Sequence, residues 1–184
     1  MLRFEVSSLR LNSGNKMIGK LLLPPKYEQI DGPLIFLAGP IQGATRWQDT
    51  AIKLINSYSS QVNIASPRRN EEYRKGDFTP DRYNEQVDWE TFHLRRAAED
   101  GAILFWLTKE AEHRCERAYA QTSRFELGEW KIRHERDKIK LALGIEDGFT
   151  NRRYITRRFS QDCPNITIFS SLEETCREAV RLVF

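Results

Sequence analysis

The sequence predicts an α/β protein with an open, largely parallel β-sheet covered by helices on both faces. Five short apolar runs alternate along the chain with longer segments of helical periodicity. The runs are apolar throughout rather than alternating, which is typical of parallel strands buried on both faces. The length of 184 residues suits a single domain with a substantial core. The predicted strands are residues 34–38, 62–66, 102–107, 139–145 and 166–170.

Residues 1–30 are predicted to form an extension that precedes the α/β domain of residues 31–184. Two apolar stretches, RFEVSSLRL and KMIGKLLL, flank the polar sequence NSGNK. They could pair as a hairpin or cover the core directly, and the sequence leaves both arrangements open. The stretch LPPKYEQIDGP that follows is predicted to be a linker, because its prolines and its Asp-Gly pair interrupt regular structure.

The predicted helices separate the strands in regular order. The first strand ends at a Gly-Pro pair, and the segment WQDTAIKLINSY beyond it has helical periodicity. The second helix carries Val87, Leu94 and Ala98 near one face, as expected of a helix that packs on a sheet. The third strand, AILFWL, is the most apolar of the five. The predicted helices are residues 47–58, 81–100, 122–138, 150–159 and 171–183.

Composition and charge set broad limits on function. A net charge of +3 permits an anionic small molecule but does not require nucleic acid. The basic stretch RRYITRR is interpreted as a solvated helix face, with Tyr154 and Phe159 expected to face the core. Three cysteines without close spacing argue against disulfides and favour the cytoplasm. No apolar run suits a signal peptide or a membrane span, and the three histidines lack metal-binding spacing.

Three segments of chemical interest follow strands one, two and three. Open parallel sheets bind ligands beyond the carboxyl ends of their strands, so these segments are expected to meet in one crevice. The first is LAGPIQG, whose glycines let backbone N–H groups approach a ligand while the next helix N-terminus favours an anion. A tight strand–helix turn explains the same residues equally well. The candidate ligand-binding residues here are Gly39, Pro40, Ile41, Gln42 and Gly43.

The second segment, NEQVDWE, carries three carboxylates in the early part of a predicted helix. Acidic residues there complement the helix dipole, which is sufficient to explain Glu85. Asp88 differs because it adjoins Trp89, and a carboxyl against an aromatic wall can have a raised pKa and act as a proton donor. Asp88 is therefore the first candidate for a general acid, and Trp89 a candidate for contact with the substrate.

The third segment, TSRFELGEW, contains Ser123 followed three residues later by Glu126. This spacing predicts a capping box, with Ser123 as the N-cap and Glu126 reaching back to its amide. A carboxylate in the first helical turn is also held ionised by the helix dipole, as nucleophilic attack on a sugar carbon requires. The two roles share one geometry, and both interpretations remain open.

Other polar and aromatic residues lie near these segments. Arg68 and Arg69, in SPRR, could hold a phosphate or carboxylate in a bidentate manner, or pair with the neighbouring glutamates as a surface network. Trp89, Trp106 and Trp130 could stack on a nucleobase, although core packing also explains them, and Trp106 is expected in the core.

These residues resemble the nucleoside 2-deoxyribosyltransferase family over about residues 34–160, with the Glu-Leu-Gly element as the most specific part. The resemblance implies a flavodoxin-like, doubly wound sheet. It also implies transfer of a 2-deoxyribosyl group between nucleobases without a metal or organic cofactor, in a homo-oligomer. The motifs that carry the likeness are IFLAGPIQGATRWQ, SPRR, EQVDWETFHL, ILFWLTKE, YAQTSRFELGEW and GIEDGFTNRRYITRRF.

The same resemblance implies roles for individual residues. Glu126 would be the nucleophile that attacks C1′ and forms a covalent deoxyribosyl-enzyme. Asp88 would protonate the leaving base and deprotonate the incoming one, with Glu90 as the substitute candidate. The AGPIQG loop would line the sugar and base pocket. The family usually has an aromatic residue in the loop after strand one, where this chain has Leu37 and Ala38.

Two other functions compete with transfer. A hydrolase of the same superfamily would let water accept the deoxyribosyl group, from nucleosides or from nucleoside monophosphates. The GPIQG loop offers no hydroxyl or arginine cluster for a phosphate, which favours transfer, although Arg68 could reach the site. A nucleotide-binding module without turnover would have no need of two carboxylates beside its ligand.

Overall fold

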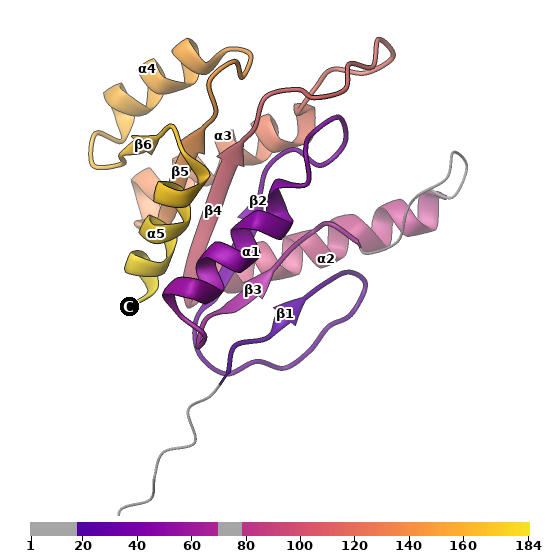
Figure 1. The fold of residues 1–184 in the computed structure, drawn as a ribbon, viewed down its shortest axis with the longest axis vertical. Helices are drawn as coiled ribbons and strands as arrows, with labels where there is room; N and C mark the ends of the chain where they lie inside the picture. The colour runs from indigo at the N-terminus through magenta and orange to yellow at the C-terminus, as the bar shows by residue number, and fades with distance from the viewer. Residues whose placement is uncertain (1–17, 70–78) are drawn as a thin grey trace, which may run out of the picture.

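The computed structural model describes residues 18–69 and 79–184. Its centre is a six-stranded, all-parallel sheet in the order β1-β3-β2-β4-β5-β6 (Figure 1). The strands are β1 (Leu21–Leu22), β2 (Leu34–Ala38), β3 (Asn63–Ala65), β4 (Gly101–Leu107), β5 (Leu141–Ile145) and β6 (Ile168–Phe169). The helices are α1 (Trp47–Tyr58), α2 (Pro80–Glu99), α3 (Gln121–Asp137), α4 (Arg152–Asp162) and α5 (Leu172–Val183).

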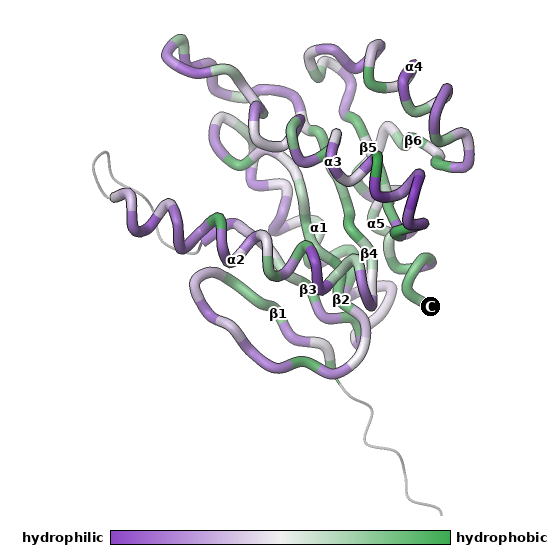
Figure 2. The backbone as a smooth tube through the Cα atoms, turned by 180° about the vertical axis from the view of Figure 1, so that it is seen from behind, coloured by the Kyte–Doolittle hydropathy of each residue, from purple (hydrophilic) through white to green (hydrophobic). Residues whose placement is uncertain are grey.

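The sheet separates two hydrophobic layers. Successive side chains of a strand point to opposite faces, so Ile35 and Leu37 pack with α1 and α5, while Phe36 packs with α2 and α3 on the other side. Buried hydrophobic side chains cover both faces of the sheet, which explains why the central strands are apolar throughout. Figure 2 shows these strands as mostly hydrophobic, whereas the outer helix α2 is mostly hydrophilic. Trp106 lies in the core, as expected.

The predicted fold class is confirmed. The strands β3-β2-β4-β5-β6 follow the 2-1-3-4-5 order of flavodoxin-like sheets, with helices on both faces. The sheet has one strand more than the five that were predicted. Residues Leu21–Leu22, in the predicted N-terminal extension, pair in parallel with β3 at the edge of the sheet. The first half of the proposed hairpin lies outside the described residues.

A side-chain cap is present in this fold, at the start of α5. The Ser171 hydroxyl accepts a hydrogen bond from the backbone N–H of Glu174 at 3.2 Å and donates to its carboxylate at 2.6 Å. The first contact satisfies a backbone N–H that the start of a helix otherwise leaves without a partner. Helix α2 begins in a related way, because the Thr79 side chain accepts from the N–H of Arg82 and Pro80 occupies the first helical position.

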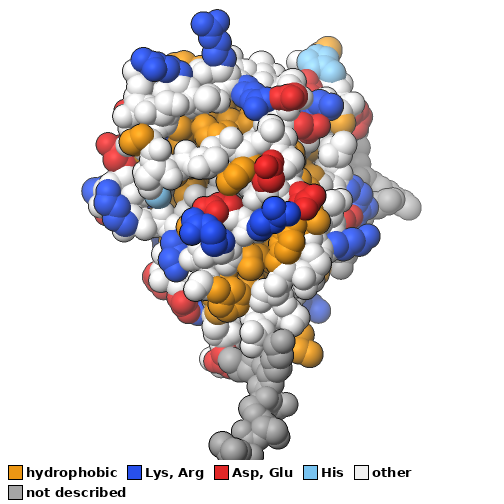
Figure 3. Space-filling view, turned by 60° about the vertical axis from the view of Figure 1, so that its left-hand side comes forward, with side chains coloured by type: hydrophobic (Ala, Val, Ile, Leu, Met, Phe, Trp, Pro, Cys, Tyr) orange, Lys and Arg blue, Asp and Glu red, His pale blue; other side chains and the backbone are white. Residues whose placement is uncertain are grey.

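Charges of both signs are mixed on the face of the molecule seen in Figure 3, with hydrophobic side chains between them. On α4, Arg152 pairs with Asp147, and Arg158 pairs with Asp162 at 3.0 Å. This pairing fits the interpretation of RRYITRR as a solvated face. Phe159 is buried as expected, but Tyr154 is exposed rather than in the core. None of the helices in the described part of the chain is long and apolar enough to cross a membrane.

Candidate active site

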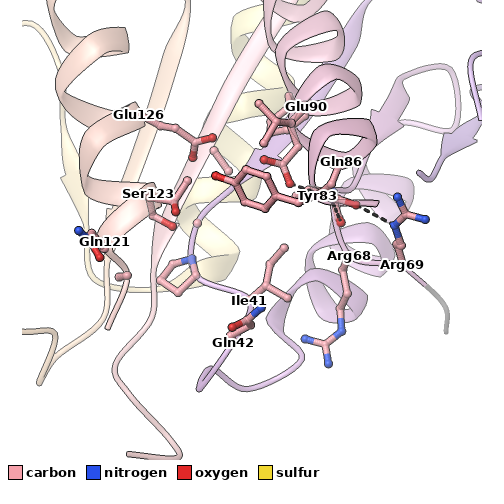
Figure 4. Close-up of a pocket in the computed structure, with 18 of the residues that line it drawn as sticks. Ile41, Gln42, Arg68, Arg69, Tyr83, Gln86, Glu90, Gln121, Ser123 and Glu126 are labelled. Atoms are coloured by element: carbon pink, nitrogen blue, oxygen red, sulfur yellow. Dashed lines mark hydrogen bonds between the residues drawn. The ribbon is translucent and has the colours of Figure 1, made fainter. Parts of the chain in front are cut away.

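A cavity of about 330 Å³ opens beyond the carboxyl ends of β2 and β3 (Figure 4). It lies between the loop after β2, the segment after β3, one face of α2 and the first turns of α3. The three segments that were expected to meet at this edge therefore do so. Its volume falls within the roughly 300–1,000 Å³ of small-molecule sites. The lining residues that carry polar side chains are Gln42, Arg68, Arg69, Tyr83, Gln86, Glu90, Arg117, Gln121, Thr122, Ser123 and Glu126.

Helix α2 supplies one wall of the cavity through residues spaced three and four apart. Tyr83, Gln86 and Glu90 lie on the same helical face and point toward the cavity (Figure 4). The Gln86 amide donates hydrogen bonds to Glu90 Oε1 at 2.7 Å and to the Pro67 carbonyl at 2.8 Å. Arg69 in turn donates to Gln86 Oε1 at 2.8 Å. The Glu90 carboxyl is therefore held in place by a chain of hydrogen bonds from the segment after β3.

Helix α3 supplies the opposite wall. It starts at Gln121, directly after Ala120, whose φ of 56° lies in the left-handed region and turns the chain sharply into the helix. Ser123 is buried in the first turn, and Glu126 follows in the second. In Figure 4 the carboxylates of Glu126 and Glu90 point toward one another from their two helices, with the Tyr83 ring between them and the loop after β2.

The two carboxyls influence one another electrostatically. Burial raises the pKa of Glu126 to about 8, and the negative charges of Glu90 and Glu129 add to this effect. Burial also raises the pKa of Glu90, against the opposing effect of its hydrogen bond from Gln86. Two carboxyls in one poorly solvated site resist the loss of both protons. Near neutral pH the raised pKa of Glu126 favours its protonated form in the free protein.

The structure corrects the predicted capping box at Ser123. Because α3 begins at Gln121, Ser123 is its third residue and not its N-cap, and no side chain caps this helix. Glu126 therefore lies beyond the first turn and does not reach back to the cap. The expectation that the helix dipole keeps Glu126 ionised is also wrong, since burial raises its pKa instead. The Glu126 side chain is thus available to the cavity rather than committed to the backbone.

The structure also corrects the placement of Asp88 and Trp89. Asp88 is exposed and does not line the cavity, and its charge acts on Tyr27 rather than on Glu126. Trp89 is fully buried, and its indole N–H donates to the Lys26 carbonyl at 2.8 Å. A residue two positions from Glu90 points to the opposite side of a helix, which excludes Asp88 from the cavity. Glu90, the substitute candidate, is the α2 carboxyl that faces Glu126.

The loop after β2 contributes four of its five candidate residues, those from Gly39 to Gln42, to the cavity. Gly39 has a φ of 148°, and a side chain there would collide with the Trp106 carbonyl, so glycine is required for close packing on β4. Gly43 lies outside the cavity, where its carbonyl accepts hydrogen bonds from Ala111 at 2.8 Å and Glu112 at 3.1 Å. Gly43 therefore holds the loop after β4 in place and does not contact a ligand in the cavity.

Three arginines reach the cavity, of which two were identified from the sequence. Arg69 is buried and pairs with Glu85 at 2.6 Å, so it serves the structure of α2. Arg68 lines the cavity, and its Nη1 atom is buried without a hydrogen-bond partner. Arg117, in the loop before α3, was missed because nothing in that loop marks it from the sequence. In the described ranges, 18–69 and 79–184, no three His, Cys, Asp or Glu side chains form a metal-binding group.

The raised pKa of Glu126 predicts a pH-dependent stability. Since its pKa is about 8 in the folded state against 4.5 normally, the folded chain binds more protons than the unfolded chain between these values. This contribution therefore lowers stability as pH rises through that window. The Glu126→Gln variant removes it, so we expect its free energy of unfolding to exceed that of the wild type by up to about 5 kcal/mol at pH 9. At pH 4.5 we expect the two to be similar.

Urea unfolding of both proteins at pH 4.5 and pH 9 measures this difference. The informative result is which of the two proteins has the larger free energy of unfolding at pH 9. A variant that is less stable than the wild type at pH 9, or a difference that is the same at both pH values, would contradict the burial of an ionisable Glu126.

Comparison with known proteins gives independent information on this site. Residues 32–142, more than half of the chain, match the family described as nucleoside 2-deoxyribosyltransferase like. The matched range includes β2, the loop after it, α2 and the whole of α3, which carries Glu126. A search of curated protein sequences found no significant match. From its fold, its site and this match, the chain belongs to the nucleoside 2-deoxyribosyltransferase-like family.

Proposed function

We propose that this protein transfers a 2-deoxyribosyl group from one nucleobase to another through a covalent intermediate on Glu126. The observation that carries the proposal is the pair of carboxyls, Glu126 and Glu90, that face each other across one open cavity. Two carboxyls that flank a glycosidic bond, one ionised and one protonated, are what retaining glycosyl transfer requires. The family match supports a nucleoside-type substrate.

In the first half of the reaction, a Glu126 oxygen attacks C1′ of the deoxyribose and forms an ester bond. The bond between C1′ and the base nitrogen breaks, and its electron pair stays with the base. Glu90 donates its proton to that base, which leaves as a neutral molecule. The hydrogen bond from Gln86 stabilises the carboxylate that remains on Glu90.

In the second half, a different base occupies the space that the first has left. Glu90 removes the proton from the attacking base nitrogen, the new C1′–N bond forms, and the ester bond to Glu126 breaks. Each step inverts C1′, so the overall reaction retains the anomeric configuration. Glu126 returns as a carboxylate and Glu90 as the acid, so the pair is ready for another cycle.

The first step needs one carboxylic acid and one carboxylate, and two close carboxyls that resist losing both protons can supply them. Because the raised pKa of Glu126 favours its protonated form in the free protein near neutral pH, Glu126 must lose its proton before it attacks. The catalytically competent form has the proton on Glu90. Charge development on the sugar in the transition state favours this form, because a carboxylate at Glu126 stabilises the positive charge at C1′.

Hydrolysis is the second candidate function. The arginines in the cavity support it, because they could bind the phosphate of a nucleoside monophosphate. Transfer was preferred because the loop after β2 offers no arginine cluster for a phosphate. The cavity nevertheless contains Arg68 and Arg117, from other segments. That argument against a nucleoside monophosphate hydrolase therefore no longer holds. In hydrolysis, water would replace the second base as the acceptor, with the same roles for Glu126 and Glu90.

Chromatography of the reaction products tests the proposal. Purified protein is incubated with a panel of deoxynucleosides and their 5′-monophosphates, each with and without a second free base. A new nucleoside or nucleotide that contains the second base supports transfer. Release of the free base alone, at equal rates with and without the acceptor, would replace transfer by hydrolysis. If no substrate changes, both enzymatic proposals fail and a binding module becomes the better explanation.

A further inference from the structure

Arg68 and Arg117 stand out among the charged residues of the cavity because neither is held by an acidic partner among residues 18–69 and 79–184. Arg68 Nη1 is buried and makes no hydrogen bond. Its neighbours are Arg46 and Asp49, which already bind one another at 3.0 Å. Within the described part of the chain, the Arg117 side chain has no hydrogen bond or ion pair. Arg69, by contrast, is fully engaged with α2.

A half-buried guanidinium without an anion nearby destabilises the folded protein, because its charge is poorly solvated. Burial lowers the pKa of Arg68, and the positive charge of Arg46 lowers it further. A buried donor without a partner also loses the hydrogen bonds that water would give it. Both costs disappear when an anion binds. An oxyanion suits this position, because a guanidinium donates two parallel hydrogen bonds to carboxylates and phosphates.

The cavity is polarised from one end to the other. In Figure 4 the Arg68 guanidinium points away from the carboxylates of Glu126 and Glu90, on the side of Ile41 where Gln42 lies. Arg117 reaches the cavity from the loop that connects β4 to α3. A ligand that spans this cavity would meet carboxyls at one end and the Arg68 guanidinium at the other.

We propose that the substrate is a nucleoside 5′-monophosphate whose phosphate is bound by Arg68 and Arg117, with the Gln42 side chain beside it. This inference rests on the proposed function, which places C1′ between Glu126 and Glu90. In a nucleoside, C1′ and the 5′ carbon lie on opposite sides of the ring oxygen. A 5′ substituent therefore extends away from the two carboxyls, toward the arginine end. A neutral nucleoside would leave the buried Arg68 Nη1 without a partner.

The test compares kcat/KM for a deoxynucleoside 5′-monophosphate with kcat/KM for the same deoxynucleoside without its phosphate. We expect the wild type to prefer the monophosphate by at least about ten-fold, as charge-assisted contacts to a phosphate provide. Arg68→Gln and Arg117→Gln should each reduce this ratio by about ten-fold or more. The control is Arg153→Gln, because Arg153 is exposed on α4 and lies outside the cavity. It should leave the ratio unchanged.

A binding measurement separates this inference from the proposed function. Calorimetric titration of Glu126→Gln with the monophosphate and with the unphosphorylated nucleoside requires no turnover. Tighter binding of the monophosphate that is lost on adding Arg68→Gln supports the phosphate site, even if the wild type proves inactive and the proposed reaction fails. Equal affinity for both ligands, or an Arg68 variant that weakens both equally, overturns the phosphate site and leaves the glycosyl chemistry intact.

Discussion

Glu126→Gln is expected to abolish turnover while the protein remains folded. The amide has nearly the same shape as the carboxyl but cannot attack C1′, so no covalent intermediate forms. Loss of a nucleophile typically lowers kcat by at least about 1,000-fold. The product chromatography described above measures the loss, and a circular dichroism melt establishes that the fold is intact. Because no capping contact depends on Glu126, we expect no loss of helix α3 in this variant.

Glu129→Gln is the matched control for this change. Glu129 lies one turn further along α3, outside the cavity, where it pairs with Arg133 at 2.8 Å. Exposed ion pairs of this kind contribute at most about 1 kcal/mol, so the control should fold and turn over normally. Incubation with a slowly released substrate, followed by mass spectrometry, should detect the ester on the wild type and not on Glu126→Gln. Substantial activity in Glu126→Gln would remove the nucleophile assignment.

Glu90→Gln and Asp88→Asn form the second decisive comparison, since they separate the two candidate acids of α2. The structure places Glu90 in the cavity and Asp88 on the exposed side of the same helix. We expect Glu90→Gln to lower kcat/KM by about 100- to 10,000-fold, the usual effect of losing a general acid. We expect Asp88→Asn to retain activity close to that of the wild type.

The leaving group distinguishes an acid from a residue that only shapes the cavity. A 2-deoxyriboside with a nitrophenolate leaving group needs little protonation as its glycosidic bond breaks. Glu90→Gln should therefore lose much less activity on this substrate than on a nucleoside. An equal loss on both substrates would indicate a structural role for Glu90. A larger loss in Asp88→Asn than in Glu90→Gln would reverse the assignment made from the cavity.

The sheet could be predicted from sequence because its central strands are buried on both faces. Such strands are continuously apolar, and each one here is followed by a helix long enough to recognise. The sixth strand could not be found in this way. Strand β1 consists of only two residues, Leu21 and Leu22. Its pairing with β3 depends on contacts between distant parts of the chain and not on a local sequence pattern.

The acidic residues show where local sequence reasoning succeeds and fails. Asp88 was favoured because it adjoins Trp89, but adjacent helical residues point in different directions, and Trp89 faces the core. The spacing of Tyr83, Gln86 and Glu90 carried the correct signal, as residues three and four apart share a helical face. Helical periodicity was thus a better guide to the cavity than neighbours in the sequence.

The Ser-x-x-Glu pattern gives a second example, because this chain contains it at two helix starts with different outcomes. The Ser171 side chain caps α5 by accepting from the Glu174 N–H, whereas Ser123 does not cap α3. The difference arises from the long connection between β4 and α3, which delivers the chain to its helix three residues earlier than the pattern suggests. That connection is fixed by the backbone bonds to Gly43, which no local pattern reveals.

The Pro40 carbonyl accepts hydrogen bonds from the Trp47 indole at 2.8 Å and from the Gln48 amide at 3.4 Å. Both donors belong to α1, on the side of the sheet that holds neither Glu126 nor Glu90. Substitutions in this remote layer would thus register as defects in turnover although they touch no substrate. A mutational screen scored only on product formation would therefore mistake the supports of the loop for members of the reaction centre.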